Sequence, residues 1–313
     1  MAINLRGADV SEHNGVIDFS QLKNNVDFLI IRSSYGSNDS SQDDGQAARN
    51  VAQCEKYKIP YGVYHFLYAE SVAAAKSEAQ HCLRVIKECK ATPTYGVWLD
   101  IENDGNYKPL GGTLSAEMLK NITVTFCETI EAAGYYVGIY SNPWAFENNR
   151  YLGQSDILKY DKWCAEWGSK CTYKGDYGIW QYTDSGTLPG ISTPVDMNQC
   201  YRNYPSLSAK TSAGVTMPDY STGATYTDSA DESASSSSGT SWSQVINEDG
   251  AQKKSVKITG SYLVFNGEYT PTQLEVALEN YYGAAPKVIQ SRRDRWSKIT
   301  ANLREIFPQL YIR

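Results

Sequence analysis

The feature that most constrains the fold of this chain is an alternation between short β-like runs and amphipathic helical patterns across residues 1–207. Strands that alternate with helices predict a parallel sheet. Eight such runs in about 200 residues predict that the sheet closes into a barrel. The β-like runs are residues 7–10, 28–33, 61–67, 95–101, 136–141, 162–166, 177–182 and 194–198.

Three helical patterns lie between these runs. Apolar residues recur at spacings of three and four across 47–54, 75–89 and 119–133, which is typical of one face of a helix. Ser115 is the expected N-cap of the third helix, and Gly134 is its expected end. After residue 141 the segments between β-like runs are short, so we expect the last part of the barrel to lack full crossover helices.

The composition changes at residue 208. Residues 208–243 are rich in Ser, Thr, Gly, Ala and Asp, and they hold too few apolar residues for a core, so a flexible linker is predicted. Residues 244–313 are predicted to form a small α+β module. Its expected elements are a hairpin or two strands over 256–265, a helix from Thr270 to about Tyr282 and a helix over 294–307.

Charge and cysteine content exclude several classes of function. The net charge of −6 argues against nucleic acid as the main partner, because phosphate binding requires a basic surface. The seven cysteines and three histidines include no Cys-x-x-Cys and form no zinc pattern, so no metal or other cofactor is expected. We interpret most cysteines as small buried hydrophobes of a protein made in a reducing cytosol.

Targeting signals are also absent from the sequence pattern. The N-terminus lacks the apolar core of a signal peptide. No stretch approaches the roughly 18 apolar residues of a membrane span. We therefore expect a protein that is made in a cytoplasm without a secretion signal and does not span a membrane.

The strongest local signal for chemistry is the run Val97-Trp-Leu-Asp-Ile-Glu-Asn103. Residues two apart in a strand point to the same face, so Asp100 and Glu102 should project together. They lie at the carboxyl end of an apolar strand, where parallel barrels carry their active sites. Two close carboxyl groups cannot both ionise freely, and the resulting acid and anion are what glycoside hydrolysis requires. A solvated acidic pair at a strand end is the alternative interpretation.

Two further aspartates are expected at the same mouth. Asp9 lies near the end of the first predicted strand, and Asp196 lies on the last. Because the first and last strands of a closed barrel are neighbours, both should lie near Asp100 and Glu102. Each aspartate alone is typical of an ordinary turn, but four acids around one mouth favour a catalytic site.

Aromatic residues gather near the predicted strand ends. The chain has 24 Tyr and 7 Trp against 7 Phe, and aromatics with a polar group suit a wet groove that binds hydroxyl-rich ligands. A core role is the alternative for each one, and His65 among them is read as structural because no Gly-x-Ser-x-Gly motif is present. The candidate substrate contacts are Tyr64, Phe66, Trp98, Tyr140, Trp167, Trp180, Gln181, Tyr182 and Asn198.

Seven ordered motifs within residues 4–205 resemble the glycoside hydrolase family 25 muramidases, which include Chalaropsis-type lysozymes and many phage endolysins. The motifs are Asp9–Ser11, Gly62–Phe66, Trp98–Glu102, Gly138–Ser141, Trp163–Trp167, Trp180–Tyr182 and Asp196–Asn198. The resemblance implies that 1–207 is a catalytic domain with an irregular TIM-like (β/α)5(β)3 barrel. It also implies hydrolysis of the β-1,4 bond from N-acetylmuramic acid to N-acetylglucosamine in bacterial peptidoglycan. By that resemblance Glu102 is the proton donor, and Asp9, Asp100 and Asp196 supply the negative charge around the sugar.

Several alternatives remain open. The attacking group is the substrate's 2-acetamido oxygen, an enzyme carboxylate or water, and we favour the first, with retention of configuration. A chitinase-type barrel is disfavoured because Tyr95 and Trp98 stand where its earlier aspartates fall. A non-catalytic wall-binding or virion structural protein that keeps the barrel is the second alternative. Without a signal peptide, the resemblance favours a phage endolysin or a virion-associated lysin. Residues 244–313 are interpreted as a cell-wall-binding, homo-oligomerising or virion-anchoring module.

Overall fold

The computed structural model describes residues 3–104, 107–216, 219–221, 255–259 and 262–266. The chain divides into two compact units, residues 1–231 and 232–313, and each is described by itself. Within the described residues, no helix is both long enough and apolar enough to cross a membrane.

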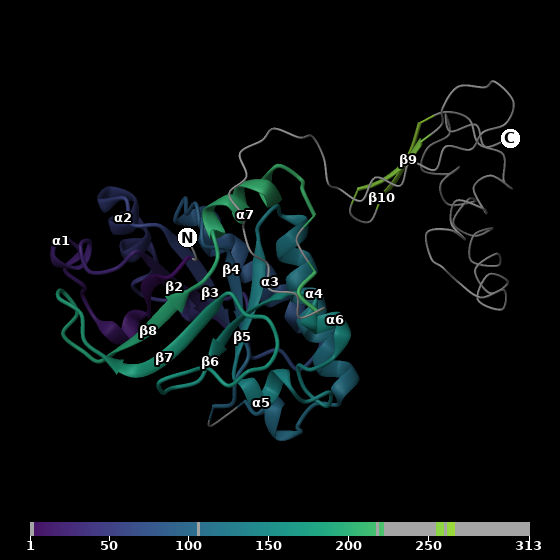
Figure 1. Cartoon of the computed structure of the whole chain (residues 1–313), viewed down its shortest axis with the longest axis horizontal. Helices are drawn as coiled ribbons and strands as arrows, with labels where there is room; N and C mark the ends of the chain where they lie inside the picture. The colour runs from purple at the N-terminus through teal and green to yellow at the C-terminus, as the bar shows by residue number, and fades with distance from the viewer. Residues whose placement is uncertain (1–2, 105–106, 217–218, 222–254, 260–261, 267–313) are drawn as a thin grey trace, which may run out of the picture. The chain divides into compact units, whose positions relative to one another are not determined.

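Eight strands of the first unit close into a barrel in chain order (Figure 1). Neighbours from β1 to β7 are parallel, and β8 runs antiparallel to both β7 and β1. This confirms the predicted α/β barrel and its eight strands. The strands are β1 (Leu5–Val10), β2 (Phe28–Tyr35), β3 (Tyr61–Phe66), β4 (Val97–Asp100), β5 (Val137–Ser141), β6 (Asp161–Ala165), β7 (Ile179–Gly186) and β8 (Val195–Cys200).

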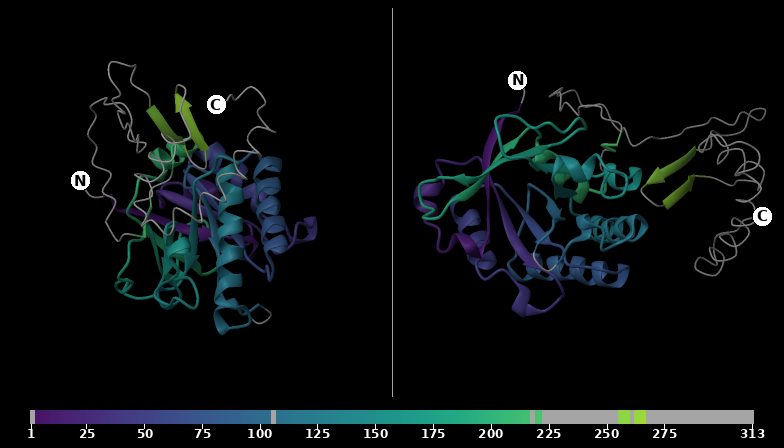
Figure 2. Two further views of the ribbon diagram at one scale, coloured as in Figure 1. Left: turned by 90° about the vertical axis from the view of Figure 1, so that its right-hand side faces the viewer. Right: turned by 90° about the horizontal axis from the view of Figure 1, so that it is seen from below.

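Helices cover the outside of the barrel unevenly. The long helices α3 (Val72–Glu88) and α4 (Ala116–Ala132) lie side by side (Figure 2), and α2 (Ala47–Tyr57) packs on β2. Ser115 caps α4 as predicted, because its side chain accepts the backbone N–H of Met118. After β5 the helices α5 (Pro143–Phe146) and α6 (Ser155–Leu158) are one turn long, which confirms the predicted loss of full crossover helices. The remaining helices are α1 (Phe19–Leu22), α7 (Tyr204–Ser212) and the 3-10 turns η1 (Glu12–Asn14), η2 (Ser40–Gln42) and η3 (Pro109–Gly111).

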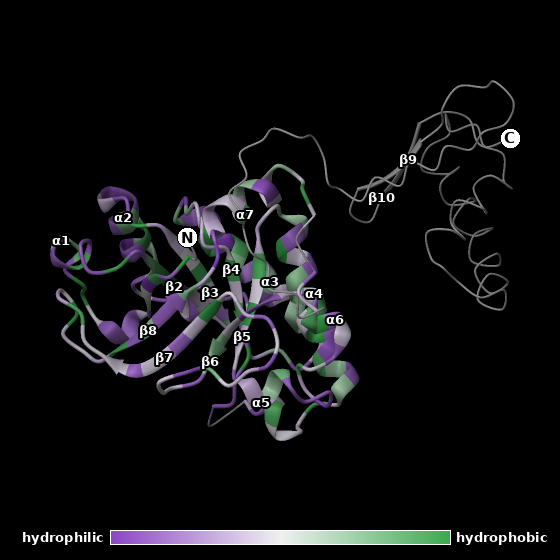
Figure 3. Ribbon diagram, viewed as in Figure 1, coloured by the Kyte–Doolittle hydropathy of each residue, from purple (hydrophilic) through white to green (hydrophobic). Residues whose placement is uncertain are grey.

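The two faces of the strands form separate buried clusters. Alternate residues such as Val97 and Leu99 pack outward against the helices, whereas Trp98 points into the barrel and packs with Trp163 and Tyr204. In Figure 3 the central strands β4 and β5 are accordingly hydrophobic, while α2 shows a hydrophilic side. The interior is tightly filled: a Cβ on Gly138 would lie 2.3 Å from the Trp98 ring, so only glycine fits there.

The first residues assigned to the linker belong to the barrel unit instead. Helix α7 extends to Ser212, and Tyr220 is buried beside β6. The Tyr220 hydroxyl lies 2.7 Å from the hydroxyl of Tyr136, and the Arg202 guanidinium lies 4.4 Å from the Tyr220 ring centroid. The predicted boundary at residue 207 is therefore too early. A single aromatic side chain, Tyr220, makes these contacts. The sequence of the segment did not reveal them because it contains few apolar residues.

Two strands of the second unit lie in the described residues. Strands β9 (Ser255–Thr259) and β10 (Tyr262–Asn266) form an antiparallel pair, which confirms the hairpin or two strands predicted over 256–265. The two helices predicted after Thr270 and the remaining linker residues 222–243 lie outside the described residues.

Candidate active site

A groove of about 730 Å³ lies at the carboxyl ends of the barrel strands. Asp100 is the last residue of β4 and Phe66 the last of β3, so the groove occupies the end at which α/β barrels carry active sites. Its lining is mainly acidic and aromatic. The acids are Asp9, Glu12, Asp100, Glu102, Asp104 and Asp196, and the aromatics are Tyr35, Tyr64, Phe66, Tyr68, Tyr140 and Trp163.

The groove brings together all four predicted acids. Asp100 and Glu102 come from the end of β4 and the residues after it. Asp9 and Asp196 are direct partners in the antiparallel pairing of β1 and β8. The expectation that the first and last strands are neighbours is confirmed, and it explains why residues 187 positions apart (196 − 9) share one site.

The environment of Asp100 and Glu102 favours protonated carboxyl groups. Burial raises the pKa of Glu102 to about 7, and the negative charges of Asp9 and Asp104 act in the same direction. Burial also raises the pKa of Asp100 well above its usual range, followed by repulsion from Glu102 and Asp9, with partial relief from Arg32. The pair therefore retains a proton at neutral pH, as an acid catalyst requires.

Asp9 is held by two side-chain amides. Asn198 Nδ2 and Gln181 Nε2 both donate to Asp9 Oδ2, at 2.8 and 3.0 Å. The amides are themselves oriented, because Trp163 Nε1 donates to Asn198 Oδ1 at 2.7 Å and the Tyr140 hydroxyl donates to Gln181 Oε1 at 3.0 Å. These contacts point the N–H groups at Asp9 and favour its anion.

Asp196 is the proton-bearing member of the second acidic pair. Burial raises its pKa to about 8, and the charge of Asp9 and a hydrogen bond with Asp9 add to the effect. Burial also raises the pKa of Asp9, but the hydrogen bonds from Asn198, Gln181 and Asp196 oppose it. A protonated Asp196 beside an anionic Asp9 is the arrangement that these contacts favour.

Four of the nine predicted substrate contacts line the groove, and five do not. Those in the lining are Tyr64, Phe66, Tyr140 and Gln181. Trp98 shares its strand face with Asp100 but lies two residues deeper, inside the barrel, and donates to the Tyr95 carbonyl at 2.8 Å. Asn198 likewise lies two residues deeper in the barrel than Asp196. It is fully buried and donates to Asp9. The prediction that Trp98 and Asn198 contact substrate is therefore wrong. Both side chains lie on the strand face that points into the barrel, but both are too deep in the barrel to reach the groove.

The other three residues lie around the β6–β7 connection. Trp180 donates to the Glu166 carbonyl at 2.7 Å, and Tyr182 packs near the Trp180 ring; neither lines the groove. Trp167 is 60% exposed and donates to Gln181 Oε1 at 3.1 Å. Trp167 therefore lies outside the groove but forms a hydrogen bond with Gln181, which lines the groove.

Arg32 lines the groove although it was not among the predicted site residues. Its Nε donates to Asp44 Oδ2 and its Nη2 to Glu12 Oε1, both at 2.8 Å. The sequence did contain a signal for Arg32, because it is a charged residue within the otherwise buried strand Phe28–Tyr35. A buried charge is stable only when it is paired with groups of opposite charge. Tyr68 was also missed; its hydroxyl donates to Asp104 in the same lining.

A buried series of Ser34, His65 and Glu78 lies outside the groove lining. Ser34 Oγ is 2.8 Å from His65 Nδ1, and His65 Nε2 is 3.0 Å from Glu78 Oε2. The order resembles a nucleophilic triad, but all three side chains are sealed from solvent and burial lowers the pKa of His65. This is the structural role predicted for His65.

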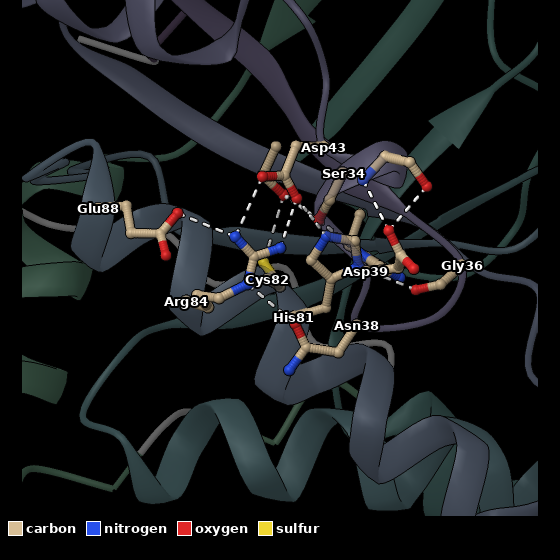
Figure 4. A network of polar contacts seen from close by, with 12 residues as sticks. Ser34, Gly36, Asn38, Asp39, Asp43, His81, Cys82, Arg84 and Glu88 are labelled. Carbon is tan, nitrogen blue, oxygen red and sulfur yellow. Dashed lines mark hydrogen bonds and ion pairs between the residues drawn. The ribbon is translucent and has the colours of Figure 1, made fainter.

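An adjoining network secures the segment that follows β2 (Figure 4). Asp43 receives His81 Nε2 at 2.7 Å and also pairs with Arg84, while His81 Nδ1 lies 3.1 Å from the Gly36 carbonyl oxygen. Helix α3 supplies both basic residues. The network therefore ties α3 to the segment next to Tyr35 of the groove. In the described parts of the chain, no group of three or more His, Cys, Asp or Glu side chains is arranged to hold a metal ion.

An α/β barrel with carboxyl groups gathered at the carboxyl ends of its strands is an architecture typical of glycoside hydrolases. The family model of the glycosyl hydrolases family 25 matches residues 8–191. The chain belongs to this family, and the resemblance inferred from the seven motifs is confirmed.

Individual relatives support the assignment. The autolytic lysozyme of Clostridium acetobutylicum is 24% identical over 204 residues, which are 62% of this chain and 55% of the relative. The modular autolysin LytC of Streptococcus pneumoniae, solved with a synthetic peptidoglycan ligand, is 29% identical with a TM-score of 0.55 over 63% of this chain and 47% of LytC. The chain thus spans about half the length of these two proteins. The catalytic domain of endolysin ply40 from bacteriophage P40 of Listeria monocytogenes is 25% identical with a TM-score of 0.55, over 66% of this chain and 97% of that domain.

Proposed function

We propose that this protein is a muramidase that hydrolyses the β-1,4 bond between N-acetylmuramic acid and N-acetylglucosamine in bacterial peptidoglycan. The observation that carries the proposal is the placement of the paired acids, Asp100 and Glu102, in one groove. Glu102, with a pKa of about 7, shares the groove with a buried Asp100. The family assignment and the two wall-lytic relatives add support.

Glu102 is the proposed proton donor. It is the more exposed member of the pair, and its carboxyl group keeps a proton near neutral pH. It gives that proton to the glycosidic oxygen as the bond to the anomeric carbon of N-acetylmuramic acid breaks. The positive charge that develops on the sugar is stabilised by the anionic members of the acidic cluster.

Asp100 is proposed to hold the 2-acetamido group of the substrate. Its Oδ1 atom is buried and has no hydrogen-bond partner among the described residues, and such an atom is costly unless a ligand satisfies it. The acetamido N–H is a donor of the required kind. That bond favours the Asp100 anion, leaves the proton on Glu102 and orients the acetamido oxygen for attack, so we expect retention of configuration.

The remaining lining residues are proposed to position the glycan. Tyr64, Phe66 and Tyr140 present aromatic surface within the groove, and aromatic faces suit the apolar faces of sugar rings. The exposed Trp167, bonded to Gln181, is proposed to contact the chain just outside it. The Asp9 anion, hydrogen-bonded to the protonated Asp196, completes the negative field around the reacting sugar.

The biological setting is a separate proposal. The likeness to a phage endolysin domain supports a phage endolysin or virion-associated lysin that acts on the bacterial wall. For residues 244–313 we propose wall binding, because tethering a second module to the enzyme raises its effective concentration at the substrate. The alternative roles are self-association and virion anchoring. A pull-down on purified walls, combined with a mass measurement in solution, distinguishes the three roles.

Product analysis of purified peptidoglycan tests the activity. Digested material is reduced with borohydride, and the reduced sugar at the new ends is identified by mass spectrometry. Reduced N-acetylmuramic acid is expected. Reduced N-acetylglucosamine instead would overturn the bond assignment, and release from chitin in a parallel digest would favour the chitinase alternative. Wall binding without any new reducing ends would favour a non-catalytic protein.

A further inference from the structure

Cys164 and Cys171 form the one sulfur–sulfur contact among the seven cysteines, all of which fall in the described residues. Cys164 lies in β6 and is fully buried. Cys171 lies in the connection to β7 and is partly exposed. Their sulfur atoms are 3.7 Å apart, so a small side-chain movement would bring them to bonding distance.

The two thiols differ in the way that disulfide exchange requires. The hydrogen bond with Cys164 lowers the pKa of Cys171, and the backbone N–H of Tyr173 and the hydroxyl of Tyr177 act in the same direction. Burial and the negative charge of Glu166 oppose this shift without reversing it. The same contact, together with burial, raises the pKa of Cys164. Cys171 is therefore both the accessible thiol and the better source of thiolate, while Cys164 is protected behind it.

We propose that Cys164 and Cys171 are a reversible oxidation site, at which a low-molecular-weight disulfide such as oxidised glutathione converts the two thiols into an intramolecular disulfide. The Cys171 thiolate attacks one sulfur of the oxidant and expels the first glutathione thiolate. Cys164 then attacks the Cys171 sulfur of the mixed disulfide, its proton passes to the leaving sulfur, and the second glutathione is expelled. Two protein thiols and one oxidised glutathione thus give one protein disulfide and two reduced glutathiones.

The surrounding structure is already arranged for this bond. The Glu166 carboxylate accepts the backbone N–H and the hydroxyl of Thr172, which fixes the turn between the two cysteines. The bond closes a loop of eight residues, 164–171, that carries Trp167. Since neither cysteine lines the groove, oxidation strengthens the attachment of this loop and leaves the catalytic acids in place.

The consequence is a protein that is more stable in oxidising than in reducing surroundings. A loop of this length predicts a rise in melting temperature of roughly 5–10 °C on oxidation. Activity on peptidoglycan at room temperature should remain within about twofold. The inference does not depend on the proposed muramidase activity, because its readouts are a covalent bond and a melting temperature.

Tryptic mapping of the full chain tests the site directly. Trypsin cleaves after Lys162, Lys170 and Lys174, so Cys164 and Cys171 fall in separate peptides, 163–170 and 171–174. Native protein is treated with oxidised glutathione, alkylated and digested. We expect the two peptides as one linked species, which separates after reduction, and we expect the oxidised protein to melt at the higher temperature.

Two substitutions control the experiment. Cys171→Ser should abolish both the linked peptide and the temperature shift, whereas Cys89→Ser, which alters a partly buried cysteine at the end of α3, should retain both. Three results would overturn the proposal: unlinked peptides with glutathione left on Cys171, a linked peptide that forms only after unfolding in urea, or a temperature shift that survives in Cys171→Ser.

Discussion

Asp9 and Asp196 face each other where the barrel closes, as direct partners in the antiparallel pairing of β1 and β8. The hydrogen bond between their carboxyl groups requires a proton on one of them. Because Asn198 and Gln181 donate to Asp9, the proton belongs on Asp196. The strand junction that completes the fold therefore also builds half of the acidic cluster.

This asymmetry predicts different effects for two matched substitutions. Asp196→Asn replaces a protonated carboxyl group with a neutral isostere, so wall lysis should fall by about tenfold or less. Asp9→Asn removes the anion and directs an amide toward two amide donors, so lysis should fall by about 100-fold or more. Initial rates on purified peptidoglycan measure both. Equal losses, or a larger loss for Asp196→Asn, would show that the proton is assigned to the wrong residue.

Asn198 is predicted to support the site rather than contact substrate. Asn198→Ala removes a donor to Asp9 and the acceptor of Trp163 Nε1, which should lower the free energy of unfolding by about 1–3 kcal/mol. Urea denaturation measures this change. Trp163→Phe, which removes the indole N–H together with part of a fully buried ring, should lower the free energy of unfolding at least as much. A fully stable Asn198→Ala protein with a raised KM would instead restore the role of Asn198 as a substrate contact.

The raised pKa of Glu102 predicts a pH-dependent cost to folding. Below its ordinary pKa of 4.5 the carboxyl group is protonated in both states, so it contributes no difference. Between 4.5 and about 7 the unfolded chain ionises while the folded protein does not, so stability falls as pH rises. Glu102→Gln should therefore be more stable than the wild type by roughly 3 kcal/mol at about pH 8.

That difference should vanish near pH 4, where both proteins carry a neutral side chain. Urea denaturation at the two pH values makes the comparison, and the wild type at each pH is the internal control. A stability difference that is independent of pH would mean that Glu102 is not held protonated by its surroundings.

The Ser34–His65–Glu78 series should prove structural. Ser34→Ala leaves a buried histidine nitrogen without its partner, so the free energy of unfolding should fall by about 1–3 kcal/mol. Since the serine is sealed from solvent, lysis by the folded variant should stay within about twofold of the wild type. A folded Ser34→Ala protein that loses lysis would point to a hydrolase of another kind.

The acidic cluster was accessible from sequence because it depends on strand ends. A parallel barrel places the carboxyl ends of its strands together, so Asp9 and Asp100 could be brought to one mouth without coordinates. The length and hydrophobic alternation of the strands show in the sequence where each strand ends, and so place these two aspartates at the mouth. The neighbouring of the first and last strands predicts that Asp9 and Asp196 lie at the same mouth, but the register that pairs them directly is seen only in the structure.

The depth of a side chain within the barrel could not be predicted from the sequence in the same way. Alternation distinguishes the two faces of a strand but not how far a side chain lies from the mouth of the barrel, so it places Trp98 on the same face as Asp100 without showing that Trp98 is buried below the groove. The anchoring of Tyr220 was missed because a single aromatic residue in a polar segment has no periodic signal. The pairing of Cys164 with Cys171 depends on a loop conformation that residue types alone do not specify.

The most direct test of the central claim is the rate of wall lysis by Glu102→Gln, measured against pH and alongside a proof of folding. Glutamine keeps the shape of the protonated acid but has no proton to give, so lysis should fall by at least about 100-fold while the protein stays folded. The wild-type rate should decline as pH rises through about 7, where Glu102 loses its proton. A folded Glu102→Gln protein that clears walls at the wild-type rate would contradict the account.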